Sequence, residues 1–281
     1  MALVDRQWLW MAAACYLAGL ILGTISLIRE KRHSRATMYA IIAGGYVLQT
    51  IGLALRGHAV HGCPLGNTFE FFQFTAWSVT TLYLLIGATF RLSMLGFFTS
   101  GLAAVFTIFS LSMPSWDAVR HTGLFAGNPW VALHAGMAMF SYGTFAMLAL
   151  TSLLYLFRQY SLKHKHLGGW FSFLPSLMDL EQISLRLLVA GVSMMSASLI
   201  VGYFYWRLDD AVVDRSKLLA VISVWSCYAA TLALRSRGRL VARRFAWVCA
   251  ILFVMAMLSL WPVDRSRHPP AKVHSGVTIA P

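Results

Sequence analysis

The sequence predicts an all-α protein, a polytopic bundle of about eight transmembrane helices with both termini on the outer, non-cytoplasmic side. Of its 281 residues, 58% are hydrophobic and only 12% are charged, whereas soluble domains usually carry about 25% charged residues. The apolar residues form continuous runs of about 18 residues or more, the length that an α-helix needs to cross a bilayer. Only helices or closed barrels pair every backbone polar group inside lipid. The runs are longer than the roughly 10-residue segments of barrel strands, which favours helices.

Eight apolar runs follow one another along the chain, separated by short polar or basic segments. They cover residues 8–28, 37–55, 68–90, 95–112, 129–157, 183–206, 216–234 and 245–262. The third run contains Glu70 and Gln73, and the fifth contains His134, Ser141 and Tyr142. Because polar groups are costly at membrane depth, we expect these side chains to face the bundle interior or a wet cavity.

The segment Trp170–Glu181 is neither a membrane span nor a polar loop. Pro175 interrupts it, and its apolar residues predict a piece that lies in the inner membrane interface before the sixth helix begins. We interpret residues 1–262 as a single transmembrane helical domain. Residues 263–281 are expected to form a short, polar and poorly ordered tail on the outer side.

The orientation of the bundle follows from its Lys and Arg residues, which collect on the cytoplasmic side of membrane proteins. The loops after the first, third, fifth and seventh runs, together with Arg186, hold fourteen basic residues. The other loops and both tails hold nine basic residues and six aspartates. The richer set is therefore predicted to be cytoplasmic. The net charge of +13 is then explained by membrane orientation, and no binding to nucleic acid is expected.

Histidine is the main residue type in this sequence that could carry chemistry. Six of the nine histidines are predicted at or near the outer face, and imidazole is a common ligand of metals and haem iron. These six are His58, His61, His121, His134, His268 and His274. Their spacing does not match a structural zinc site. The other three histidines lie among cytoplasmic basic residues.

His134 differs from the other histidines because it lies about one turn inside the fifth predicted helix, after Pro129 at the helix start. Two interpretations stay open: a hydrogen bond to a neighbouring helix, or an axial ligand at the outer membrane surface. Aromatic residues, among them Trp206, are predicted at the same level and are mostly the usual interfacial belt. The nearby Arg207 could pair with haem propionates or lipid phosphates, or simply flank the span.

The sequence contains few other features of an active site. It has no Gly-rich phosphate loop, no nucleophile elbow and no C-x-x-C motif, and its only adjacent carboxylates are Asp209 and Asp210. Three cysteines lie inside apolar runs, where Cys behaves as a small hydrophobic residue, and Cys63 lies in a loop. We therefore expect no enzymatic activity of its own.

Four segments carry sequence patterns that occur together, in this order, in one family. The segments are Pro64–Glu70 with Phe71–Trp77, Leu133–Met137 with Ser141 and Tyr142, Leu174–Leu177 with Leu180 and Glu181, and lastly Lys217, Trp225, Tyr228, Arg235 and Arg237–Arg239. Together they resemble the cytochrome c assembly family of haem-handling membrane proteins, specifically its CcsA/HemX-like branch. The resemblance covers roughly residues 60–260.

The resemblance implies a protein that receives non-covalently bound haem b at the outer face. In the family, two histidines on outer segments ligate the iron. His134 matches the first position, and His268 is the nearest candidate for the second. By their place beside this region, Trp206 and Arg207 are further candidates for contact with the cofactor.

The chain also departs from the family pattern. The family's tryptophan-rich loop, W-G-x-x-W-x-W-D, is absent between Gly202 and Lys217, and a histidine of the haem-transporting members corresponds to about Ala233. In this respect the chain resembles the HemX-like members more than a complete haem exporter.

Two functions follow from the sequence, and they belong to different classes. The first is assistance of cytochrome c assembly by binding haem at the outer face of a bacterial inner (cytoplasmic) membrane. Its partners would be membrane lipid, haem, a second assembly subunit and apocytochrome c. The alternative is a non-haem membrane scaffold that regulates haem synthesis or organises partner proteins. A small-solute permease is less favoured, because the sequence indicates no broken helix pair and no buried charge pathway.

Overall fold

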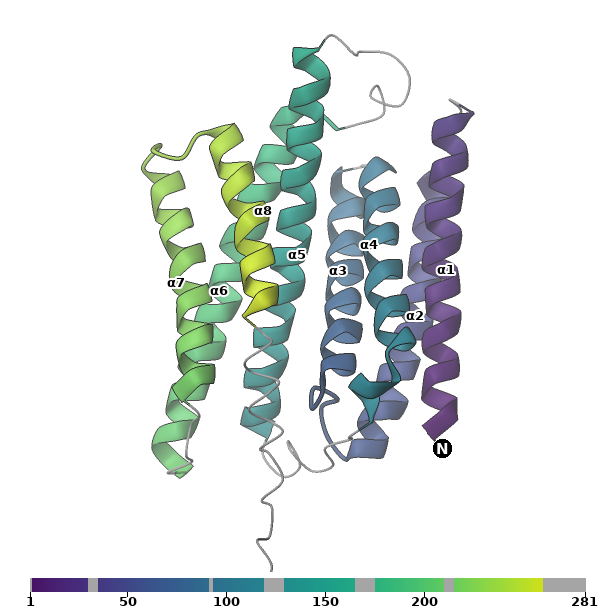
Figure 1. Cartoon of the computed structure of the whole chain (residues 1–281), viewed down its shortest axis with the longest axis vertical. Coiled ribbons are helices and arrows are strands. Elements are labelled where there is room, and N and C mark those ends of the chain that lie inside the picture. The colour runs from purple at the N-terminus through teal and green to yellow at the C-terminus, as the bar shows by residue number, and fades with distance from the viewer. Residues whose placement is uncertain are drawn as a thin grey trace, which may run out of the picture.

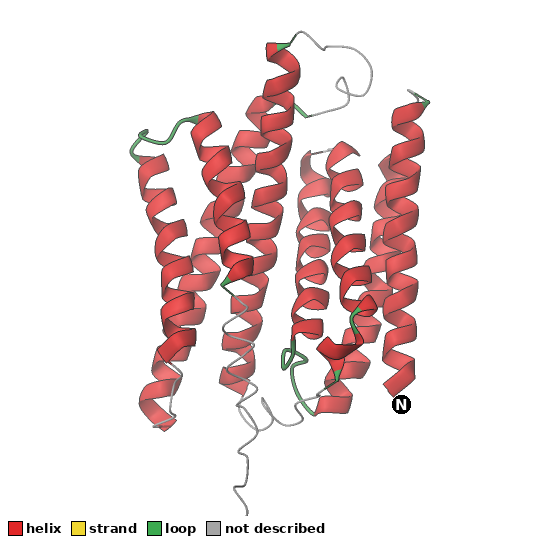
Figure 2. Ribbon diagram, in the orientation of Figure 1, coloured by secondary structure: helices red, strands yellow, loops and turns green. Residues whose placement is uncertain are grey.

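The computed structural model describes residues 2–29, 35–90, 93–118, 129–164, 175–209 and 215–259. These residues form eight α-helices and one 3₁₀ helix and contain no strand (Figures 1 and 2). The helices are α1 (Ala2–Ile28), α2 (Arg35–Val60), α3 (Thr68–Phe90), α4 (Ser93–Ser112), η1 (Pro114–Asp117), α5 (Pro129–Lys163), α6 (Leu177–Asp209), α7 (Arg215–Ser236) and α8 (Ala242–Leu258). The predicted all-α fold is confirmed.

Each helix coincides with one of the eight apolar runs, and most extend a few residues past the run. Six of them (α1, α2, α4, α5, α6 and α7) are long and apolar enough to cross a membrane. The other two are α3, which begins with polar residues that include Glu70 and Gln73, and α8, which has 17 residues. Both run alongside the six in the bundle (Figure 1). The chain is therefore an integral membrane protein.

The bundle has two ends that are distinguished below by their place in Figure 1. Helices α1, α3, α5 and α7 begin at the lower end, and α2, α4, α6 and α8 run back toward it (Figure 1). The lower end corresponds to the side that the distribution of Lys and Arg predicts to be outside. The predicted tail, residues 263–281, lies outside the described residues.

The start of α6 corrects one prediction. Residues 177–181 form its first turns instead of a separate interfacial piece, while residues 165–174 lie outside the described ranges. Ser176 caps the helix: its Oγ accepts a hydrogen bond from the Asp179 N–H at 3.1 Å, and its carbonyl oxygen accepts one from the Leu180 N–H at 3.1 Å. A Ser at this position pairs with orphan N–H groups of the first turn. The Ser-x-x-Asp spacing was the signal for this helix start.

The helices form two groups of four, α1–α4 and α5–α8, which lie side by side (Figure 1). In the first group α1 packs on α2 and α4, and α3 packs on α4; in the second, α5 packs on α6 and α8. The groups meet mainly where α3 packs against α5. Nine consecutive residues of α5, Ser141–Ala149, are buried, so that α5 is covered on all sides at this level. A helix buried all round is a central element of its fold.

Gly143 of α5 makes the close contact between the two groups possible. A β-carbon at this position would lie 2.2 Å from Cβ of Ser78 in α3. One residue before it, the Tyr142 ring packs edge-on against Phe71 of α3, with ring centroids 5.7 Å apart. Small residues allow membrane helices to approach closely, where dispersion contacts hold them together.

We predict that Gly143→Ala lowers the free energy of unfolding by about 1–3 kcal/mol, the usual cost of overpacking a core. The matched control is Gly44→Ala, since a β-carbon at Gly44 in α2 would meet no atom within 4 Å. The measurement is the thermal unfolding of both variants in mild detergent. Equal stability of the two variants would contradict the close α3–α5 contact.

Candidate functional site

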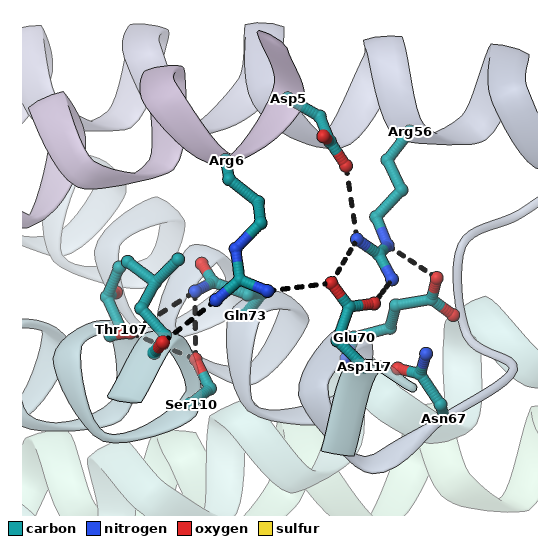
Figure 3. Close-up of polar contacts among 10 residues, drawn as sticks. Asp5, Arg6, Arg56, Asn67, Glu70, Gln73, Thr107, Ser110 and Asp117 are labelled. Atoms are coloured by element: carbon teal, nitrogen blue, oxygen red, sulfur yellow. Dashed lines mark hydrogen bonds and ion pairs between the residues drawn. The ribbon is translucent and has the colours of Figure 1, made fainter. Parts of the chain in front are cut away.

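The lower end of the first helix group contains a buried cluster of charged side chains (Figure 3). At its centre is Arg56, near the end of α2, whose side chain is 0% exposed. Its Nε donates to Oε1 of Glu70 at 2.6 Å, its Nη1 donates to Oδ2 of Asp5 at 3.1 Å, and its Nη2 donates to Asp117. One guanidinium therefore joins carboxylates from α1, α3 and η1. We call these residues, together with Arg6, the Arg56 cluster.

A second arginine closes the Arg56 cluster toward the surface. Arg6 of α1 donates to Oδ2 of Asp117 at 3.2 Å and to the carbonyl oxygen of Leu111 at 2.9 Å. The ring of Phe69 lies against both guanidinium groups: its centroid is 4.6 Å from Cζ of Arg56 and 5.6 Å from Cζ of Arg6. Cation–π contacts of this kind are strongest where water is excluded. The charges are thus held by three kinds of partner: carboxylates, a backbone carbonyl and an aromatic face.

The loop between α2 and α3 is fixed to the same cluster. Oε2 of Glu70 accepts the Gly66 N–H at 2.6 Å, and Oδ1 of Asn67 accepts the Glu70 N–H at 2.9 Å, which caps the start of α3. Burial, and in second place the Glu70 carboxylate, raise the pKa of Cys63 in this loop to about 11. Since the thiolate is the reactive form, Cys63 stays protonated and unreactive at neutral pH.

Neutral polar side chains continue from the Arg56 cluster into the middle of the first helix group. Gln49 Nε2 donates to Oε1 of Gln73 at 3.0 Å, and Gln49 Oε1 accepts the Tyr16 hydroxyl at 2.8 Å. Gln73 Nε2 in turn donates to Oγ of Ser110 at 2.9 Å. The expectation that Glu70 and Gln73 face the interior is confirmed.

Arg56 corrects one expectation: by sequence it is one of the nine basic residues of the outer loops and tails, whereas the structure buries it among carboxylates. The cluster is buried, but the network that continues from it consists of amides and hydroxyls. Its hydrogen bonds join α1–α4, the 3₁₀ helix η1 and the α2–α3 loop, so that its evident effect is to hold the lower end of the first group together. One signal in the sequence could have predicted the cluster. Asp5, Glu70 and Asp117 each lie within a turn or two of a helix end, on the same side of the membrane as Arg56.

Removal of the central cation should be strongly destabilising. We predict that Arg56→Gln lowers the free energy of unfolding by about 3–5 kcal/mol, because it leaves buried carboxylates without their counter-charge. Arg6→Gln is the comparison: its side chain is 24% exposed and Asp117 keeps Arg56 as a partner, so the expected loss is smaller, at most about 2 kcal/mol. Unfolding in detergent measures both, and equal small losses would mean that the cluster is hydrated and not buried.

A second polar site lies near the lower end of the second helix group, where α5 meets α6. The Nδ1–H of His134 donates to the backbone carbonyl oxygen of Ser198 at 2.7 Å. The Ser198 hydroxyl donates back to the carbonyl oxygen of His134 at 2.8 Å, and its Oγ lies 3.0 Å from Nδ1. These reciprocal bonds fix both the ring and the backbone of His134 to α6. The interhelical hydrogen bond is one of the two interpretations that the sequence left open.

Gly202 of α6 provides the space for the His134 ring. A β-carbon at Gly202 would lie 2.8 Å from both Cε1 and Nδ1 of that ring. Gly202 follows Ser198 by four residues, so that both lie on one face of α6. The backbone of α6 therefore packs closely against the imidazole ring of His134.

The bond to Ser198 decides the chemistry that His134 can perform. A carbonyl oxygen only accepts hydrogen bonds, so Nδ1 carries the proton and a neutral ring has a bare lone pair on Nε2. Metal-ligating histidines in proteins are held in this way, with the second nitrogen bonded to a carbonyl or carboxylate. The ring is half-buried. Trp130, 61% exposed, lies one turn earlier on the same helix. Nε2 of His134 is therefore the ring nitrogen that could serve as a ligand to a metal-containing cofactor.

The other predicted site residues are not brought together with His134 by the described structure. Trp206 and Arg207 belong to the last turns of α6, four and five residues after Gly202, and their side chains lie outside the described set. His268 also lies outside the described residues. In the described ranges, no group of three or more His, Cys, Asp or Glu side chains could hold a metal ion. Ser198 and Gly202 were not predicted, because an apolar run gives no sign of which helix a buried histidine will meet.

The sequence pattern of the cytochrome C assembly protein family matches residues 65–266 of this chain. The chain belongs to that family. The match begins in the loop that is fixed to Glu70 and includes His134, Ser198 and Gly202. Helices α1 and α2 precede it, and they supply Asp5 and Arg56 to the cluster.

Curated relatives agree with this family. Protein HemX of Bacillus subtilis (strain 168) is 27% identical over 223 residues, which cover 78% of this chain and 80% of that protein. Cytochrome c biogenesis protein CcsA of Mesostigma viride is 28% identical over 111 residues, 39% of this chain and 36% of that protein. Inner membrane protein YpjD of Escherichia coli (strain K12) is 25% identical over 123 residues, 44% of this chain and 46% of that protein. The similarity to HemX thus extends over most of both chains.

Proposed function

We propose that this membrane protein assists cytochrome c assembly by holding haem b at the outer membrane face, with Nε2 of His134 as an axial ligand to the iron. Membership of the cytochrome c assembly family supports the process. The hydrogen bond from Nδ1 to Ser198 is the observation that supports His134 as the ligand, because it fixes the tautomer in which Nε2 has no proton. When bound, haem would supply an iron that takes axial nitrogen ligands.

The remaining contacts to the cofactor are proposed from their place in the sequence. His268 is the candidate for the second axial ligand. Arg207 would offer its guanidinium to a propionate, since arginine binds carboxylates through two parallel hydrogen bonds. Trp206 would present an aromatic face close to the same helix end. Together these side chains would bind and orient the cofactor without a covalent bond to it.

The proposed setting is the bacterial inner (cytoplasmic) membrane, with His134 on the outer side. The proposed partners are a second cytochrome c assembly subunit and apocytochrome c, the protein that would finally take up the haem. We propose a binding and transfer role instead of catalysis. The family and the relatives named above support the process, and the charge distribution supports the orientation.

The scaffold hypothesis is the second candidate, and departures from the family pattern favour it. The tryptophan-rich loop is missing, and Ala233, at about the position of a histidine of the haem-transporting members, lies exposed on α7. In that case the bond between His134 and Ser198 only joins two helices. The protein would then organise partners or regulate haem synthesis without holding the cofactor.

The decisive experiment is a visible spectrum of the full chain, purified in mild detergent from cells with ample haem. We predict the bands of six-coordinate b-type haem in the wild type and their loss or conversion in His134→Ala. His58→Ala is the matched control, because this exposed histidine lies at the same end of the first group. A wild type without haem, or a His134→Ala variant with an unchanged spectrum and unchanged activity in cytochrome c assembly, would favour the scaffold instead.

The fit of the ring against α6 gives a finer prediction. Gly202→Ala should displace the imidazole and reduce the haem content of the purified protein several-fold, because the added methyl group overlaps the ring. Gly136→Ala on α5 is the control, since a β-carbon there would meet no atom within 4 Å. Pyridine haemochrome assays per mole of protein measure both variants. Equal haem content in the two would show that the position of His134 does not govern binding.

A further inference from the structure

The turn between α7 and α8, at the upper end of the bundle, presents a dense group of exposed arginines. Residues 237–244 contain four exposed arginines, Arg237, Arg239, Arg243 and Arg244. We call these four residues the arginine patch. Their sequence positions alone indicate only the cytoplasmic side.

The backbone of this turn is well defined. Gly238 has φ +70°, a left-handed conformation that glycine adopts easily. Its N–H donates to the carbonyl oxygen of Arg235 at 3.0 Å, and the Arg239 N–H donates to that of Leu234 at 3.0 Å. This pair of bonds is the Schellman arrangement that ends many helices. The arginine patch is therefore carried by a fixed turn.

A fifth arginine holds the turn and is not part of the patch. Arg235 donates from Nη2 to Oε1 of Glu181 in α6 and from Nη1 to the carbonyl oxygen of Leu240 at 2.9 Å. Its guanidinium also lies 5.3 Å from the centroid of the Phe245 ring. Arg235 thus ties α6, α7 and α8 together, and its charge is neutralised by Glu181.

Within the part of the chain that the structure describes, the arginine patch has no comparable counter-charge. Among the described residues, the carboxylates at the upper end are Asp179 and Glu181, which bind Ser176 and Arg235 respectively. Arg243 and Arg244 also stand in the first turn of α8, where the helix dipole disfavours cations. These arginines therefore do not stabilise α8. An anion bound from outside the chain would stabilise it, because it would neutralise their charge at the start of the helix.

Apolar side chains next to the patch indicate the kind of anion. Trp247 is 51% exposed and lies three and four residues after Arg244 and Arg243, so that all three share one face of α8. Val241, in the turn itself, is 62% exposed. An exposed indole one turn deeper than two guanidinium groups is the arrangement of a helix end at a membrane surface. A phospholipid offers a phosphate and an apolar chain in the same order.

We propose that the arginine patch is a binding site for anionic phospholipid headgroups, in which Arg243 and Arg244 hold the phosphate and Trp247 contacts the acyl region. Arginine binds phosphate with paired hydrogen bonds, and juxtamembrane basic clusters attract anionic lipids. This site lies on the opposite end of the bundle from His134 and does not depend on the proposed haem function.

The test compares lipid binding to the full chain in neutral detergent, measured by native mass spectrometry with phosphatidylglycerol and with phosphatidylcholine. Arg243→Gln with Arg244→Gln should weaken phosphatidylglycerol binding about 25-fold, because each basic residue at a membrane surface contributes about fivefold and the two factors multiply. The matched control, Arg29→Gln with Lys163→Gln, removes two exposed basic residues at the ends of α1 and α5, on the same side of the membrane, and should weaken binding clearly less than the first pair.

Three results would overturn the proposal. The first is equal phosphatidylglycerol affinity in the two double variants, and the second is equal affinity for phosphatidylcholine in the wild type. The third is displacement of the lipid by inorganic phosphate or an acidic peptide at the same concentration, which would indicate a site for free anions or for a protein. If the first double variant does not fold, Arg237→Gln with Arg239→Gln tests the same patch outside the helix and is expected to weaken binding more than the control does.

Discussion

The pairing of polar groups inside lipid is the constraint on which this structure depends. Water is absent from the bilayer core, so a polar side chain there must find its partner on another part of the protein. Gln49 and Gln73 bind each other across α2 and α3, and Trp225 of α7 donates to Oγ of Ser196 in α6 at 2.8 Å. The apolar surface of a helix can face lipid anywhere, whereas each of these pairs exists in one arrangement only. The polar pairs therefore select this packing among the many that the apolar runs would allow.

The pairing of polar groups has a different result in each of the two helix groups. In the first group, Arg56 gathers three carboxylates, and the whole network serves to hold helices and loops together. In the second, His134 is bound through one ring nitrogen, and its other nitrogen is the one that we propose as a ligand. The first group thus forms a rigid support, and α5, packed on α3, connects the histidine to it. This arrangement places a single donor atom on a fixed frame near a membrane surface.

The eight helices could be predicted from the sequence because the length and apolarity of a span depend on the chain alone. The site could be predicted only in part. His134 was recognisable from its depth in an apolar run, and the family resemblance gave it a role. Ser198 and Gly202 were not recognisable, because which face of α6 meets α5 is decided by packing between helices. For the same reason Arg56 looked like an ordinary charge at a helix end, although its partners come from three separate segments.

The state of the His134 ring is the central claim, and nitrogen NMR tests it most directly. The full chain would be labelled with ¹⁵N-histidine, and the His134 signals would be assigned by their absence in a His134→Gln variant. In haem-free protein, with the ring in its neutral form, we expect a proton on Nδ1 and none on Nε2, and we expect haemin to shift the Nε2 signal. A proton on Nε2 with a bare Nδ1 would contradict the bond to Ser198, and the proposed ligand would be lost with it.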